Sequence, residues 1–153
     1  MKDSLEKIRK YLNDEGIDCT YNNYNLIFPV LQNSETKKAI VESITETHDV
    51  IRLSVSITFD FEITPKNKNR LAEYLHRANF NMIRGNFEYN LDTNQIRFIH
   101  YFEKDIISKK DYTIYNILIP ARMFRLYFDG LLDVLTTNKN PKKIINEIEK
   151  DMN

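Results

Sequence analysis

The segment IRLSVSITFDFEI, residues 51–63, alternates apolar and polar side chains without a break. A period of two is typical of a β-strand with one face in the core and the other facing water or a partner. Such one-sided alternation favours an antiparallel sheet, because strands of parallel sheets are usually apolar on both faces. We expect one strand over residues 50–63, roughly 43 Å long at about 3.3 Å per residue, which would bend or overhang its neighbours. The core is expected to contain Leu53, Val55, Ile57, Phe59 and, from a following helix, Leu75.

The remaining elements follow from periodicity and from residues that start or end helices. Thr64-Pro65 and Asn140-Pro141 each place a capping residue before a proline, which is typical of a helix start. Pro120 lies within a long apolar segment and predicts a kink or a restart of the helix there. Helices are expected over residues 4–15, 65–81 and 112–135 and from 141 onward; strands are expected over 24–31, 38–47, 50–63, 84–91 and 95–103.

This order predicts an α+β fold: helix, three-stranded meander, helix, β-hairpin and long C-terminal helix. The sheet is expected to be five-stranded and mostly antiparallel, with the helices packed on it. The chain has 153 residues and shows no internal repeat or linker, so we expect a single domain over residues 1–153.

Composition narrows the class of protein. The 22 basic and 22 acidic residues cancel, which gives no long-range attraction to nucleic acid or to an anionic membrane. No segment approaches the roughly 20 apolar residues of a membrane helix, and the N-terminus has no apolar signal region. The single cysteine, Cys19, fits a reducing compartment. We therefore expect a cytoplasmic protein with neither nucleic acid nor membrane as its partner.

The residues that carry chemistry are sparse. The three glycines are too widely separated to form a phosphate-binding loop. His48, His76 and His100 share no short metal-binding spacing, and Cys19 is distant from all three in sequence. We therefore expect no catalytic residue, no metal and no cofactor.

Two alternatives remain open at this stage. His100 is in register with the apolar positions of its strand, so it is either a core or interface histidine or the centre of an assembled enzyme site. The hairpin also interleaves arginines with aromatic residues, which is similar to a sheet that binds single-stranded nucleic acid. The hairpin residues concerned are Arg84, Phe87, Tyr89, Arg97, Phe98 and Tyr101.

A local pattern adds a resemblance to a known family. The expected second helix reads Leu71-x3-Leu75-x3-Asn79, the next strand Gly85-x-Phe87-x-Tyr89, and an aspartate, Asp92, stands in the turn. Together with the order of elements and with Pro141 after the long helix, this resembles the YbjN family of sensory-transduction regulators and, through it, the fold of type III secretion chaperones. The resemblance implies a small regulatory or chaperone-like module, often dimeric, with no catalytic residues to carry over.

The second hairpin strand suggests how such a module would act. Its residues are apolar on both faces, and the helices of a domain this size cover only one of them. We therefore expect a non-enzymatic protein-binding or regulatory module that uses this face of its sheet either to form a homodimer or to hold a protein or peptide segment. The predicted interface residues are Arg97, Ile99 and Tyr101.

Overall fold

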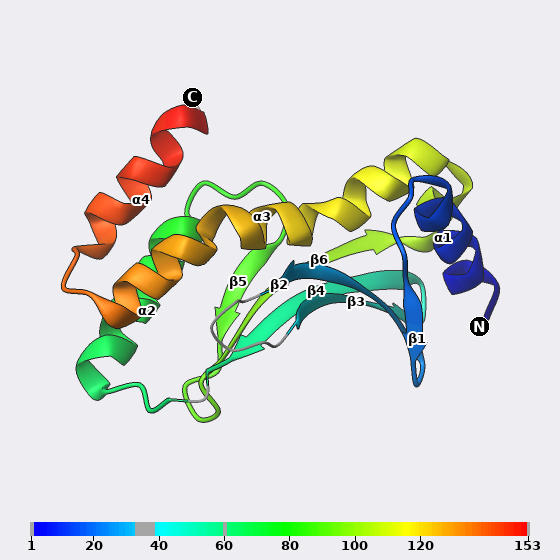
Figure 1. Cartoon of the computed structure of the whole chain (residues 1–153). Coiled ribbons are helices and arrows are strands. Elements are labelled where there is room, and N and C mark those ends of the chain that lie inside the picture. Colours follow the sequence, from blue (N-terminus) through cyan, green and yellow to red (C-terminus); the bar gives the residue numbers. More distant parts are fainter. Residues whose placement is uncertain (1, 33–38, 60, 153) are drawn as a thin grey trace.

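The computed structural model describes residues 2–32, 39–59 and 61–152. Figure 1 shows the helices over one side of a curved sheet, with α3 crossing the sheet and α1 and α2 near its two ends. The helices are α1 (Lys2–Asp14), α2 (Pro65–Asn79), α3 (Lys110–Thr136) and α4 (Pro141–Glu149), with short 3₁₀ turns η1 (Lys104–Ser108) and η2 (Lys150–Met152). The strands are β1 (Thr20–Asn22), β2 (Asn25–Gln32), β3 (Ala39–Thr47), β4 (Val50–Thr58), β5 (Asn86–Tyr89) and β6 (Gln95–Glu103).

The predicted α+β fold is confirmed. The sheet has six strands in the order β1-β2-β3-β4-β6-β5, and all neighbouring pairs are antiparallel. The prediction of five strands omitted β1, which has only three residues, all exposed. A strand this short carries no alternating burial pattern, and this is why the sequence did not indicate it.

The expected strand over residues 50–63 is shorter than its alternation suggested. Strand β4 ends at Thr58, and Thr58 pairs with Gln95, the first residue of β6. Beyond that point the chain has no partner strand in the described sheet, so the ladder stops there. Phe59 and Ile63 are nevertheless buried, whereas Phe61 is exposed. Asp60 lies outside the described residues.

The core lies between the sheet and the helices. Leu53 and Val55 of β4 are fully buried, and Leu75 of α2 and Phe59 are buried too, as predicted. Ile57 is only partly buried, since it lies near the end of the strand. Apolar residues of α1 and α3 complete the same cluster, so the helices cover one face of the sheet and leave the other without a helix in the described chain.

The predicted helix starts are confirmed by their caps. Thr64 accepts a hydrogen bond from the Asn67 amide at 3.3 Å, ahead of Pro65 in the first turn. Asn140 likewise accepts from the Lys142 amide at 2.9 Å, ahead of Pro141. Each side chain satisfies an amide that the first turn leaves unpaired, which stabilises a helix by about 1 kcal/mol.

Pro120 does not restart the long helix, because α3 is one helix of 27 residues with Pro120 inside it.

A fully buried carboxyl group, Glu42 of β3, faces this part of the helix. Neither carboxylate oxygen has a hydrogen-bond partner among the described residues. Burial raises the pKa of Glu42 well above its usual range, although the Ala121 backbone and the Arg125 guanidinium act in the opposite direction.

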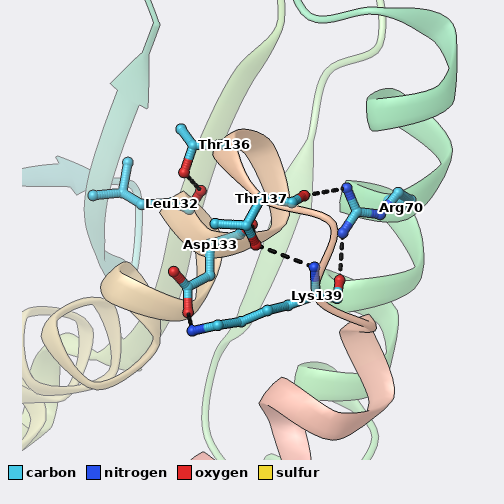
Figure 2. Close-up of polar contacts among 6 residues, drawn as sticks. All are labelled: Arg70, Leu132, Asp133, Thr136, Thr137 and Lys139. Carbon is cyan, nitrogen blue, oxygen red and sulfur yellow. Dashed lines mark hydrogen bonds and ion pairs between the residues drawn. The ribbon is translucent and has the colours of Figure 1, made fainter.

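The corner between α3 and α4 is held by an arginine from α2. Arg70 donates to the carbonyl oxygen of Val134 at 2.9 Å. It also donates to the carbonyl oxygens of Thr137, at 2.8 Å, and Lys139 (Figure 2). Lys139 in turn pairs with Asp133 at 2.5 Å. The Val134 and Thr137 carbonyls belong to the end of α3, where the helix leaves carbonyl groups unpaired, and Lys139 lies in the connection to α4. Arg70 therefore caps α3 and ties down the connection that leads into α4.

Candidate binding groove

A groove of 660 Å³ opens where α3 passes between the α2–β5 loop and the C-terminal end of the chain. The loop forms one wall with residues 81–84, and Glu149 and Met152 form the other. The floor is a row of side chains on α3: Tyr115, Ile119, Met123 and Tyr127.

The floor residues are spaced four apart, which places them in one row on the helix surface. From Tyr115 to Tyr127 the row runs about 18 Å at 1.5 Å per residue, or roughly three helical turns. Met82 and Met152 stand on the two walls, opposite Met123 on the floor. Methionine side chains are flexible and polarizable, so this lining can adapt to an apolar ligand.

Two large apolar side chains beside the groove are almost completely exposed. Ile83 is 96% exposed and Phe80 is 82% exposed. Both belong to the segment between α2 and β5, which is the segment that forms the wall. Exposed apolar side chains gathered next to an apolar groove mark a surface for interaction with another molecule.

The same wall carries a positively charged group in a fixed position. Arg84 donates to the Tyr112 hydroxyl at 3.1 Å and to Asn116 Oδ1 at 3.3 Å. Its guanidinium carbon lies 5.6 Å from the centre of the Tyr112 ring and 5.4 Å from that of Tyr115. Cation–π contacts of this kind hold an arginine without neutralising its charge.

His100 lies beneath this arginine and is buried. Its Nε2 is 3.0 Å from Asn116 Oδ1, while the Asn116 amide nitrogen donates to the Tyr112 carbonyl at 2.8 Å. Because Oδ1 can only accept, His100 carries its proton on Nε2. Burial lowers the pKa of His100, and the charge of Arg84 lowers it further, while the hydrogen bond that His100 donates to Asn116 raises it. His100 is therefore a neutral core histidine that positions Asn116, and no carboxylate or thiol bonds it in the described part of the chain.

The opposite wall carries the other charged group of the groove. Tyr127 donates its hydroxyl proton to Glu149 at 3.1 Å. Burial raises the pKa of Tyr127, and the adjacent carboxylate of Glu149 raises it further. The hydroxyl therefore stays protonated and remains a donor to Glu149.

The three predicted interface residues lie together on the helix-free face of the sheet. Arg97, Ile99 and Tyr101 pair with the polar residues Ser56, Ser54 and Arg52 of β4.

The predicted interface residues differ in how much of each side chain is exposed to a partner. Tyr101 is 49% exposed, and Arg97 is partly exposed and paired with Glu88 at 2.6 Å. Ile99 is only 2% exposed, so its side chain is already covered by its own chain and presents almost no surface. Of these three residues, Tyr101 is the one that offers a large exposed ring.

Two aromatic residues of the hairpin are not available for stacking with bases. Phe87 and Phe98 are buried and pack edge to face, with ring centres 5.0 Å apart. Arg97, on the opposite face of the sheet, forms an ion pair with Glu88. The aromatic residues that suggested a nucleic-acid surface therefore belong mainly to the core.

Across residues 2–32, 39–59 and 61–152, no group of three or more histidine, cysteine, aspartate or glutamate side chains is arranged to hold a metal ion. Within the same ranges, none of the helices has the length and apolar character needed to cross a membrane.

Comparison with known proteins places the fold. No protein family model matches the sequence, and no curated protein matches it. Among solved structures, the chain is similar to the crystal structure of YbjN, titled "a putative transcription regulator from E. coli", with a TM-score of 0.54 and 12% sequence identity. The alignment covers 82% of this chain and 92% of that one.

The chain has a YbjN-like fold. At 12% identity the likeness concerns the fold alone, and at that level the predicted resemblance is confirmed. The structure also explains the residues that suggested a YbjN-like chain. Asn79 bonds the backbone of Phe87, and Gly85 has a φ of +72°, where a side chain would meet the Phe98 ring at 2.5 Å. The motif therefore fixes how α2 joins β5.

The sequence did not reveal the groove. Met123 and Tyr127 were visible as helically spaced residues of the long helix, but their spacing did not show that they line a groove. Arg84 and Asn116 come from a loop and a distant helix, and only the fold brings them to His100. The sequence signal that could have indicated the groove was the four-residue spacing of Tyr115, Ile119, Met123 and Tyr127.

Proposed function

We propose that this protein is a non-enzymatic binding or regulatory module that holds an apolar segment of a partner protein in the groove over α3. The observation that carries this proposal is the exposure of Ile83 and Phe80 beside an apolar groove. Leaving two such side chains in water is unfavourable by about 1.5–3 kcal/mol each relative to full burial, so a partner that covers them gains affinity.

The comparison supports a regulatory function. The similar structure, YbjN, is titled a putative transcription regulator. The lining of the groove also argues against an enzyme site there. Among the described residues, its charged groups are Arg84 and Glu149, which lie on opposite walls and do not form a nucleophile–base pair. We extend the proposal to a chaperone-like action, in which the groove keeps an apolar segment of a client protein covered.

Selection from a displayed library of random 16-residue peptides on the immobilised full chain tests this function. We expect peptides with apolar side chains spaced three or four apart and micromolar dissociation constants. Met123→Glu puts a charge on the groove floor and should weaken their binding at least tenfold. The matched control is Leu91→Glu, at an exposed residue of the distant hairpin turn, which should leave binding unchanged. Failure to select any peptide, or equal loss in both variants, refutes the proposal.

We also propose that the module acts as a homodimer, through the helix-free face of the sheet. The exposed ring of Tyr101 supports this contact, together with the partly exposed Arg97. Ile99 contributes by supporting the strand from within the chain, because its side chain is already buried. The groove lies on the helix side of the sheet, so a dimer of this kind leaves both grooves open to partner segments.

A further inference from the structure

Arg84 has more hydrogen-bonding capacity than the protein uses. A guanidinium group carries five N–H donors in a planar fork. Its hydrogen bonds to other described residues are those to Tyr112 and Asn116, and both accept through neutral oxygen atoms. No carboxylate of the described residues pairs with Arg84, whereas Arg77, Arg97 and Arg9 each pair with a glutamate.

The surroundings of Arg84 hold it ready for a ligand. The Tyr112 and Tyr115 rings are nearly parallel, at 16°, and both lie near the guanidinium. From below, Asn116 Oδ1 accepts from both Arg84 and the buried His100, so the contact is anchored in the core. An arginine positioned in this way loses little conformational freedom when it binds a planar anion.

Charge and shape together specify the ligand. Arg84 is the positively charged residue of the groove lining, and Glu149 on the opposite wall is already bonded by Tyr127. The floor is a row of residues spaced four apart along α3, in which Tyr115 and Met123 carry the accessible surface and Ile119 and Tyr127 are buried. A second helix packed along α3 would contact the two accessible side chains, which lie about two helical turns apart. An apolar helix face would fill the floor, and an acidic side chain at its edge would reach the arginine.

We propose that Arg84 is a carboxylate-binding residue and that the groove takes an amphipathic helical segment carrying an aspartate or glutamate side chain opposite Arg84. This inference rests on the proposed function and specifies its ligand. Paired arginine–carboxylate hydrogen bonds are among the strongest available to a protein surface, so the pair would select among apolar segments.

A double-mutant cycle on one peptide tests the contact. The probe is the tightest peptide from the displayed library, with its acidic residue intact or replaced by the corresponding amide, and binding is measured by fluorescence anisotropy. We expect Arg84→Gln to weaken binding 10- to 100-fold, the peptide replacement to weaken it equally, and both together to cause no further loss. Arg84→Lys keeps the charge but lacks the fork, so it should recover only part of the affinity.

The control and the remaining outcomes separate this inference from the proposed function. Arg122→Gln, at an exposed arginine of α3 outside the groove lining, should leave affinity unchanged. If the selected peptides lose affinity on Met123→Glu but not on Arg84→Gln, the groove binds segments and the carboxylate contact is wrong. If affinity depends on a free peptide C-terminus and not on an acidic side chain, the proposed ligand is wrong too. If no peptide binds, both proposals fail.

Discussion

The side-chain amide of Asn79 bonds the backbone of Phe87 at both of its polar groups. Its Nδ2 donates to the Phe87 carbonyl at 2.8 Å, and its Oδ1 accepts from the Phe87 amide at 2.7 Å. Phe87 lies on β5, the edge strand of the sheet, so Asn79 occupies backbone groups that a further strand would otherwise use.

Replacing Asn79 should therefore have two effects. Asn79→Ala removes two hydrogen bonds and should lower the free energy of unfolding by about 1–3 kcal/mol, measured by urea denaturation. It also frees the edge of β5, so the variant should self-associate more than wild type at equal concentration in light scattering. Asn81→Ala, at an exposed asparagine two residues on, is the control. Equal stability of Asn79→Ala and wild type would contradict this account.

Two glycines with the same backbone conformation allow a matched comparison. Gly16 has a φ of +73° with open space around it, whereas a Cβ on Gly85 would lie 2.5 Å from the Phe98 ring and 2.7 Å from the Ile99 carbonyl oxygen. Gly16→Ala should cost about 1–2 kcal/mol, the strain of the left-handed conformation. Gly85→Ala adds overpacking and should cost about 1–3 kcal/mol more. Thermal or urea unfolding checks the difference, and equal losses would show that the contact is relieved at no cost.

The buried carboxyl group of Glu42 should make stability fall with rising pH. Its raised pKa means that the folded protein holds a proton that the unfolded chain releases near pH 4.3. The folding stability linked to this proton is complete below about pH 4.3 and is lost as pH rises toward the folded-state pKa, by up to about 1.4 kcal/mol per pH unit.

Glu42→Gln removes that dependence. The variant should match wild type most closely at pH 4 and gain on it as the pH rises above that, until the folded-state pKa of Glu42 is passed, in urea unfolding series at each pH. Glu42→Leu, which also cannot titrate, should show the same flattened slope. A difference between wild type and variant that does not change with pH would contradict the burial of a protonated carboxyl group.

Arg70 should be needed to hold α4 in place. Arg70→Lys replaces a fork that reaches three carbonyl oxygens with a single ammonium group, and should cost about 1–2 kcal/mol. Limited proteolysis should then cut faster in the connection between α3 and α4. Arg122→Lys on the exposed face of α3 should change neither property.

The dimer proposal is tested by sedimentation at micromolar concentration. We expect wild type to sediment as a dimer and Tyr101→Glu as a folded monomer, because the charge would enter the contact while the exposed side chain supports no core packing. Circular dichroism confirms that the variant is folded. A monomeric wild type would rule out this interface.

The fold was largely readable from the sequence because strand alternation, helix caps and turn residues are local signals. Strand β6 was predicted with its observed bounds, and α2 with its observed start. The overestimate at residues 59–63 arose because alternation reports burial and does not reveal where a partner strand ends. Phe59 and Ile63 keep the predicted burial after the ladder has stopped at Thr58.

The groove could not be predicted in the same way. Arg84, Asn116 and His100 belong to a loop, a helix and a strand, and their contacts depend on how α3 crosses the sheet. The burial of Ile99 has a similar origin: its strand is apolar on both faces, but the sequence does not say that its own chain covers the second. Glu42 did carry a local signal, since it shares the strand face of Ile40 and Ile44.

One helix supports both sides of the groove. Asn79, the last residue of α2, holds the strand that follows the 81–84 wall, and Arg70, near its start, holds the corner from which α4 leads to Glu149 and Met152. The distance between the walls is therefore set by a rigid rod and not by two independent loops. Under the proposed function, α2 would therefore set the width of the groove and favour segments of matching thickness, while the methionine side chains adjust to the surface of the segment.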